Sequence, residues 1–316
     1  MSTDATPVFD ETQPCSLSLG DLAYRPSHST LVLVRPTYFD VRYNINPYMG
    51  GHVDGDRAMA QWEELRDVFE RHTDDVTVLD PTTTWDDVRG DESVRGEDIV
   101  HPEQLPDMVF SANHGLATPD GTGVVLARMA TEERAGEPAH FASWCRSEGY
   151  DVLEAPACRF EGTGDAIWHP GKELLWGGYG IRSDKEAYDD LSARLDVPVI
   201  TLELTSEHYY HLDVCFAPLD ETTVLIQPEA FTDDGLQTIH AMFERVLEVP
   251  RAESRNGLAC NCTALDDGTV VLGAGNPLTE NILSDAGYRP VPVETGEFQK
   301  AGGSVCCLKL QLGPTA

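Results

Sequence analysis

Lysine is scarce in this sequence: the 316 residues include only four lysines, so arginine supplies 18 of the 22 basic residues (22 − 4). Against them stand 54 acidic residues, which gives a formal net charge of −32. Because nucleic acids and anionic membranes are bound through basic surfaces, neither is an expected partner. Molar salt screens charges over about 3 Å and removes the self-repulsion of such an acidic coat. We therefore expect a protein from a salt-loving source.

Long apolar runs and a secretory leader are also missing. No run approaches the roughly 20 apolar residues that cross a bilayer, and the opening MSTDATPVFDETQPC has neither a basic nor an apolar segment. Eight cysteines without such a leader favour reduced thiols over a disulfide framework. These features predict a cytoplasmic protein, and 41% hydrophobic content predicts a globular one with a large core. The sequence leaves a homo-oligomer open.

Four segments of the chain share one outline: an apolar strand, a turn rich in Asp, Gly or Pro, and a second apolar strand. They begin near residues 106, 158, 211 and 260, and a spacing of about 50 residues is typical of repeat architectures. Helical patterns follow several of these hairpins, as in SDKEAYDDLSARL (183–195), where Ser183 and Glu186 form a capping box. A further short strand completes each module, which reads strand, strand, helix, strand.

A fifth module can be assembled from the two ends of the sequence. STLVLVRP (29–36) supplies one strand, and GSVCCLKLQL (303–312) supplies its hairpin partner. The repeats thus predict an α/β fold in which five ββαβ modules close into a ring with fivefold pseudosymmetry. Residues 1–28 are expected to be an N-terminal tail and residues 29–316 a single domain. The acidic stretch 82–105 is expected to be a long loop, of the kind that often serves as a lid or is disordered.

Polar residues recur where the first strand of each hairpin begins or ends. They are Asp107, Asn113, Glu161, Asp165, His211, Asp213 and the pair Cys306 and Cys307. In a closed ring these positions converge on the axis. Convergence there would bring together a nucleophile, a general acid–base group and carboxylates that hold a cation.

The adjacent thiols of Cys306 and Cys307 could form a disulfide, bind a metal, pack in the core or supply a nucleophile. A vicinal disulfide would be strained, and alternation along a strand would send the two side chains to opposite faces. One thiol is therefore expected to face the ring centre and the other to pack.

Two patterns could be taken for metal or cofactor sites. His208, His211 and Asp213 imitate part of a metal site, but no convincing further ligand accompanies them. GAGNP (273–277) lacks the glycine spacing of a nucleotide-binding turn. We expect neither a metal nor a cofactor.

The sequence resembles the guanidino-group modifying (pentein) superfamily, which includes arginine deiminases, dimethylarginine dimethylaminohydrolases and amidinotransferases. The resemblance runs from about residue 30 to residue 312. It resembles the arginine dihydrolase subtype most, in which Asn stands where deiminases and dimethylargininases have Asp; Asn113 occupies that position. The superfamily implies a five-bladed α/β-propeller and a single catalytic domain. The motifs that carry the resemblance are INPYM (45–49), PDMVFSAN (106–113), FEGTGD (160–165), GGYGIR (177–182), HLDVCFAPL (211–219) and GGSVCCLKL (302–310).

The resemblance also implies a role for each site residue. Cys307 would be the nucleophile, His211 the general acid and base, and Glu161 the carboxylate that fixes the guanidinium and the histidine. The remaining positions would bind substrate: Asp213 beside the histidine, Arg182 and Arg134 at the substrate α-carboxylate, and Asn46, Asp107 and Asn113 as further contacts.

The activity implied is cofactor-independent hydrolysis of a small molecule, free arginine or a guanidino analogue. An arginine dihydrolase would give ornithine, ammonia and carbon dioxide. The alternatives are a deiminase or dimethylarginine dimethylaminohydrolase that stops at citrulline, an amidinotransferase, and a non-catalytic arginine-binding module. The intact set of Cys307, His211 and Glu161 argues against the last, since binding alone needs no nucleophile. Asn113 has an alternative role of its own, as the cap of the turn before HGLATPDG.

Overall fold

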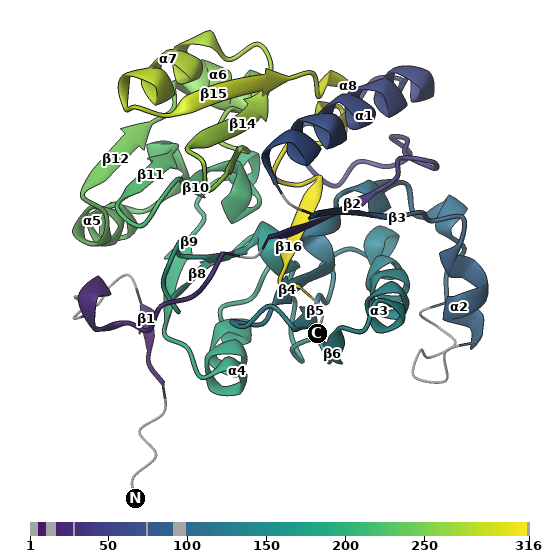
Figure 1. Cartoon of the computed structure of the whole chain (residues 1–316), viewed down its shortest axis with the longest axis horizontal. Coiled ribbons are helices and arrows are strands. Elements are labelled where there is room, and N and C mark those ends of the chain that lie inside the picture. The colour runs from purple at the N-terminus through teal and green to yellow at the C-terminus, as the bar shows by residue number, and fades with distance from the viewer. Residues whose placement is uncertain (1–5, 11–16, 28, 74, 91–98, 315–316) are drawn as a thin grey trace, which may run out of the picture.

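The computed structural model describes residues 6–10, 17–27, 29–73, 75–90 and 99–314. Within these residues, five small mixed sheets surround a common axis (Figure 1). In each sheet the first strand pairs antiparallel with the second, and the second pairs parallel with the third. Sheet by sheet, the strands are β16 (Lys309–Leu312), β2 (Thr30–Val34) and β3 (Asp75–Leu79); β4 (Gly115–Ala117), β5 (Gly123–Leu126) and β6 (Asp151–Leu153); β7 (Ala166–Trp168), β8 (Leu175–Tyr179) and β9 (Val199–Glu203); β10 (Phe216–Pro218), β11 (Thr223–Ile226) and β12 (Arg245–Glu248); β13 (Thr263–Ala264), β14 (Thr269–Gly273) and β15 (Arg289–Val293).

One helix joins the second and third strands of every sheet, so each module reads ββαβ as predicted. These five connecting helices are α1 (Gly55–His72), α3 (Glu137–Ser147), α4 (Glu186–Leu195), α5 (Asp233–Met242) and α7 (Pro277–Asp285). Three shorter helices lie between modules or beside them: α2 (Thr84–Gly90), α6 (Arg251–Gly257) and α8 (Gly296–Gln299). The predicted five-bladed α/β-propeller is confirmed.

The ring closes by pairing strands from the two ends of the sequence. β16 runs antiparallel to β2, with Lys309 opposite Leu33 and Leu312 opposite Thr30, and the two lie side by side in Figure 1. Every residue of β2 is buried, which explains its unbroken apolar sequence, since a strand covered on both faces does not alternate. The fifth module is therefore the one assembled from both ends.

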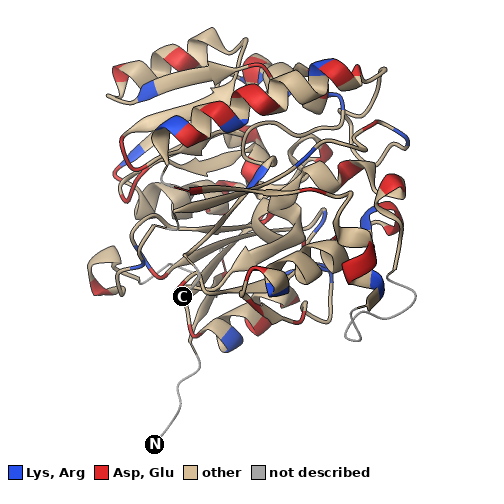
Figure 2. Cartoon of the chain, turned by 45° about the vertical axis from the view of Figure 1, so that its right-hand side comes forward, with Lys and Arg blue, Asp and Glu red and all other residues tan. Residues whose placement is uncertain are grey.

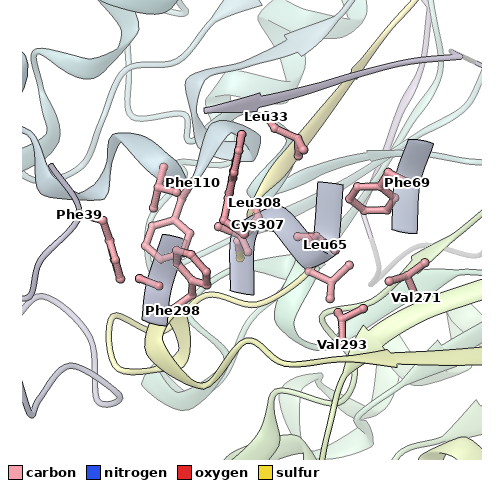
Figure 3. Packing of buried hydrophobic residues seen from close by; sticks show 14 of the residues in the cluster. Leu33, Phe39, Leu65, Phe69, Phe110, Val271, Val293, Phe298, Cys307 and Leu308 are labelled. Atoms are coloured by element: carbon pink, nitrogen blue, oxygen red, sulfur yellow. The ribbon is translucent and has the colours of Figure 1, made fainter. Parts of the chain in front are cut away.

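Helix α1 packs the largest hydrophobic cluster against this closing sheet. Asp54 caps the helix by accepting a hydrogen bond from the N–H of Arg57. Trp62, Leu65 and Phe69 lie on one face at helical spacing and are fully buried, each contributing on the order of 2 kcal/mol by leaving water. The same cluster includes Cys307, the predicted nucleophile (Figure 3).

Three expectations from the sequence differ from the structure. The predicted tail contains β1 (Val8–Asp10), which pairs parallel with β9. The predicted loop 82–105 contains α2, whose buried Val88 anchors it, and residues 91–98 lie outside the described chain. Ser183 does not cap α4: its hydroxyl donates to Asp165 and accepts from the N–H of Glu161. Each of these outcomes depends on a partner distant in sequence.

The outer surface is acidic, as the composition requires. Figure 2 shows Asp and Glu recurring along the helices, with fewer Lys and Arg among them. None of the described helices is long and apolar enough to cross a membrane.

Two cavities lie on the axis and share no lining residue. The larger, of about 630 Å³, is lined by residues from the first strand of every module, among them Ala117, Trp168, Phe216, Ala264 and Lys309. The smaller is lined mainly by the segments that precede those strands and by two arginines. Cys306 lines the larger cavity and Cys307 the smaller, so the two thiols do face opposite ways. They lie in a turn, however, because β16 begins only at Lys309.

Candidate active site

The candidate residues reach the axis on short turns that precede the first strand of each module. Glu161 stands directly before the turn Gly162–Gly164, His211 and Asp213 lie at the turn Leu212–Val214, and Cys307 lies before β16. The FEGTGD motif contains glycine because there is no room for a side chain. A Cβ on Gly162, whose φ is +59°, would lie 2.7 Å from the carbonyl oxygen of Gly115. All the predicted site residues are buried.

Glu161 binds both His211 and Arg182. Its Oε2 lies 2.5 Å from His211 Nε2 and 3.0 Å from Arg182 Nη1, while its Oε1 accepts from the N–H of Ala130 at 2.8 Å. Burial acts to raise the pKa of Glu161. The hydrogen bond and charge of His211, together with the guanidinium groups of Arg182 and Arg134, outweigh burial and hold that pKa well below its usual value. Glu161 is an anion that orients the imidazole.

The thiol of Cys307 is held by Asp213 and by a residue that the sequence analysis missed, Asn261. Cys307 Sγ donates to Asp213 Oδ2 at 3.1 Å, and Asn261 Nδ2 donates to Sγ at 3.1 Å. Burial raises the pKa of Cys307 well above its usual value, and the charge of Asp213 raises it further. Burial also raises the pKa of Asp213 to about 7, despite the opposing hydrogen bonds from Cys307 and Asn261. Both shifts favour the neutral thiol at Cys307, the predicted nucleophile.

His211 contacts Glu161 rather than the thiol. Among the described residues, no hydrogen bond joins it to Cys307, and its Nδ1 has no hydrogen-bond partner. Its ring lies 4.7 Å, centre to centre, from that of Tyr210, which lines the cavity. The histidine is thus held through Nε2, while Nδ1 makes no hydrogen bond to the described residues.

Arg134 and Asn113 form a second buried network on the cavity wall. Arg134 donates through Nε and Nη2 to Glu137 and through Nη1 to Asn113 Oδ1 at 2.9 Å. Asn113 Nδ2 in turn donates to the carbonyl oxygen of Glu161 at 3.4 Å. The side chain of Asn113 therefore bridges two parts of the site, and it does not cap the turn in which it lies.

Asn46 and Asp107 complete the polar wall. Asn46 donates to the carbonyl oxygen of Ala301 and accepts from the N–H of Tyr48. Asp107 is fully enclosed, and burial raises its pKa to about 7 against the opposing charge of Arg134. Its Oδ1 has no hydrogen-bond partner among the described residues, which leaves an acceptor on the wall.

The smaller cavity brings together six of the nine predicted residues. It has about 10 Å³ of space, roughly the room that one water needs. Glu161, His211 and Asp213 lie directly behind this wall, in contact with Arg182, Tyr210 and Cys307 respectively. The predicted residues on the wall itself are Asn46, Asp107, Asn113, Arg134, Arg182 and Cys307.

Metal ligation has no support in the part of the chain that the structure describes. No group of three His, Cys, Asp or Glu side chains there could hold a metal ion. His208, which the sequence places near His211, packs edge-on against Tyr48 instead.

Asn261 could have been found from the repeat. It precedes β13 just as His211 precedes β10 and Cys307 precedes β16. It lies at the start of the module predicted near residue 260, but an asparagine between two cysteines carries no chemical signature of its own. The register of the repeat was the available signal.

Comparison with known proteins places this site in a family. The sequence model described as "N,N dimethylarginine dimethylhydrolase, eukaryotic" matches residues 97–312. The chain belongs to this family. It is a pentein and a guanidino-group hydrolase. The N(G),N(G)-dimethylarginine dimethylaminohydrolase of Mycobacterium tuberculosis is 34% identical over 300 residues, which cover 94% of this chain and 90% of that protein.

Arginine dihydrolases are similar to the same degree. The bifunctional arginine dihydrolase/ornithine cyclodeaminase AgrE of Nostoc is 33% identical over 90% of this chain, and this chain spans 38% of that protein. For ArgZ of Synechocystis the identity is 33% and the share spanned is 37%. The N-terminal domain of the cyanobacterial arginine dihydrolase ArgZ, with product bound, superposes with a TM-score of 0.79 over 90% of this chain and 98% of that domain. The pentein family thus includes relatives of both activities at similar distance.

Proposed function

We propose that this pentein is an arginine dihydrolase, which converts free arginine and two waters to ornithine, two molecules of ammonia and carbon dioxide. The observation that carries the proposal is Asn113. Its side chain lines the cavity between Arg134 and Glu161, at the position where dihydrolases have Asn and single-step enzymes have Asp. The identity with AgrE and ArgZ supports the same assignment.

The first half of the reaction removes one ammonia. A guanidinium carbon is a weak electrophile, so the attacking group must be a thiolate. Cys307 passes its proton to Asp213, whose pKa of about 7 suits it to accept one. The sulfur attacks, the carbon–nitrogen bond breaks, and His211 donates a proton to the departing ammonia. His211 then takes a proton from water, which displaces the thiolate and leaves citrulline.

Substrate binding exchanges one guanidinium for another. Arg182 now occupies both oxygens of Glu161, the carboxylate assigned to the guanidinium of the substrate. Because the cavity has room for about one water, arginine enters only when a side chain moves. Arg182 gives up Glu161 to the incoming guanidinium and turns to the substrate α-carboxylate. The exchange keeps the buried charge of Glu161 paired throughout, which avoids the penalty of an isolated buried ion.

The second half of the reaction depends on holding citrulline. An amide side chain has both a donor and an acceptor, so Asn113 can bond either a guanidinium N–H or a ureido oxygen. A carboxylate at this position would lose its charge partner after the first step and would face an oxygen. Asn113 therefore retains the ureido group for a second attack by Cys307, which releases the second ammonia and leaves a thiocarbamate on the sulfur. The second water cleaves this thiocarbamate to ornithine and carbon dioxide and returns the thiolate.

A product assay tests the proposal. The protein is incubated separately with L-arginine and with N(G),N(G)-dimethylarginine, and ornithine, citrulline, ammonia and dimethylamine are measured, with Cys307→Ala as the control. Ornithine with two ammonia per arginine is the expected result. Citrulline and dimethylamine from dimethylarginine would instead assign the single-step activity, which the 34% identity with the Mycobacterium tuberculosis enzyme favours. Binding without turnover of either compound would indicate an arginine-binding module.

A further inference from the structure

Asn261 is the most highly connected side chain next to the nucleophile. It is fully buried, and its Oδ1 accepts hydrogen bonds from three backbone N–H groups of the turn that holds the nucleophile: Ser304 at 3.1 Å, Cys306 at 3.1 Å and Cys307 at 3.3 Å. Its Nδ2 donates to the carbonyl oxygen of Asp213 and to Cys307 Sγ, both at 3.1 Å. One amide therefore fixes the turn through its oxygen and contacts the reacting sulfur through its nitrogen.

The sulfur needs such a donor because its surroundings oppose ionisation. Burial and the carboxylate of Asp213 both act against the thiolate of Cys307. When Asp213 accepts the thiol proton, its O–H still faces the sulfur, and the amide of Asn261 supplies a second donor that does not depend on that proton. Among the described residues, Asn261 is the one side chain that donates a hydrogen bond to Sγ. Hydrogen bonds to charged groups are roughly twice as strong as those between neutral ones.

We propose that Asn261 is a catalytic residue of this hydrolase, whose side-chain N–H stabilises the thiolate of Cys307 each time that thiolate forms. The inference rests on the assignment of Cys307 as nucleophile. When the thiol proton moves to Asp213, Nδ2–H holds the electron pair left on sulfur. That pair then forms the carbon–sulfur bond. When water cleaves the thiouronium, the electron pair returns to the sulfur. The thiolate then accepts a hydrogen bond from Nδ2–H of Asn261 again.

The stabilisation is selective for the steps that need it. In the covalent intermediate the sulfur shares this pair with carbon and is a weaker acceptor, so the N–H stabilises the thiolate more than the adduct. Thiolate character is present on both sides of the intermediate, at attack and at release. Loss of the donor is therefore expected to slow both steps, because electrostatic stabilisation of developing charge is a large contribution to catalysis.

The variant Asn261→Asp separates the two roles of the amide. An aspartate keeps an oxygen acceptor for the three backbone N–H groups and replaces the donor to sulfur by a second oxygen. The measurement is the rate at which iodoacetamide alkylates Cys307 as a function of pH, with the modified peptide located by mass spectrometry. We expect the alkylation profile to shift to higher pH by about 1–2 units, with about 10- to 100-fold slower alkylation below the shifted midpoint. The value of kcat/KM falls with it.

Two further variants complete the test. Asn261→Ala removes donor and acceptor together, and if the aspartate variant does not fold, the alanine variant must show the same upward shift. Asn276 supplies the matched control: it is a fully buried asparagine of the same module, and its Nδ2 donates to the carbonyl oxygens of Gly257 and Gly273. Asn276→Ala is expected to lower the thermal midpoint without moving the alkylation profile.

The outcomes are distinct from those of the product assay. An unshifted alkylation profile in folded Asn261→Asp, with the thiol of Cys307 reacting as in the parent, would overturn the role of Asn261 and leave the hydrolase intact. An equal shift in Asn276→Ala would also overturn it, because the shift would then report loosened packing. If turnover survives Cys307→Ala, the assignment of the nucleophile itself fails.

Discussion

The thiol of Cys307 donates a hydrogen bond to Asp213 across 3.1 Å, whereas His211 binds Glu161 across 2.5 Å. The nucleophile and the histidine therefore have separate carboxylate partners. In the proposed mechanism, Asp213 receives the proton of the thiol, and Glu161 orients the imidazole that serves the leaving group and the water. This division differs from a nucleophile–histidine pair, in which one base does both tasks.

Replacing Asp213 by asparagine is expected to make the protein more stable and inactive. Burial raises the pKa of Asp213 to about 7, above the unfolded value of about 4. Between these values the folded state binds more protons than the unfolded state, so stability falls as pH rises through this range. Asp213→Asn removes the penalty, and we expect a gain of roughly 1–3 kcal/mol at pH 8 with a flatter pH dependence.

Urea denaturation of parent and variant at acid and alkaline pH measures this difference, and arginine turnover measures the activity. Glu244, which is exposed, offers a control in Glu244→Gln that alters neither quantity. Full activity in Asp213→Asn would mean that the thiol proton goes elsewhere.

The two adjacent thiols are expected to differ sharply in function. Cys307 lines the small cavity and Cys306 the large one. Cys307→Ser should lower turnover by roughly 10⁴-fold or more while arginine still binds, as is usual for loss of a nucleophile. Cys306→Ser should retain substantial activity. Steady-state kinetics and calorimetric titration with arginine check both variants, and an inactive Cys306→Ser with an active Cys307→Ser would move the nucleophile by one residue.

Asn113→Asp is expected to shift the product from ornithine toward citrulline. The new carboxylate can pair with Arg134, whose Nη1 already lies 2.9 Å from Oδ1 of Asn113, so the site should remain assembled. It offers no donor to the ureido oxygen of citrulline, which therefore leaves after one step. Chromatographic quantification of ornithine and citrulline gives the ratio. A variant that still makes ornithine alone, or a parent that makes only citrulline, would contradict the two-step reading.

Folding and activity are expected to require salt. With a net charge of −32, unscreened repulsion opposes the compact state, and the Debye length shortens from about 10 Å at 0.1 M to about 3 Å at 1 M. The thermal midpoint should therefore rise with KCl. Sucrose serves as the control, because it favours burial without screening charge. Full stability and activity in dilute buffer would refute the inference of a salt-loving source.

The ring was predictable because its signal is local and repeated. Each hairpin carries its own apolar strands and turn, and the polar positions beside the first strands include Cys307, His211 and Glu161, whose roles the superfamily resemblance implied. The superfamily motifs added the arginines. None of this required knowledge of contacts between distant residues.

The misses share one physical cause, which is competition from partners far along the chain. Ser183 reads as a helix cap, but the buried carboxylate of Asp165 is a stronger partner for its hydroxyl. Residues Val8–Asp10 were expected to belong to a tail, but they form a strand that pairs in parallel with the edge strand β9. The sequence predicts a strand at Cys306 and Cys307. This segment is a turn instead, because three of its backbone N–H groups donate to the single oxygen Oδ1 of Asn261.

The pairing of β16 with β2 brings Cys307 to residues that are synthesised before it. Four modules and β2 precede Cys307 in the sequence. The site therefore lacks its cysteine until β16 pairs with β2, although Glu161, His211, Asp213 and Asn261 have already been synthesised. Until then β2 presents an apolar, unpaired edge to other nascent chains, a hazard for aggregation. Contacts between such distant segments also form slowly. Pairing of β16 with β2 therefore both covers this edge and completes the proposed site.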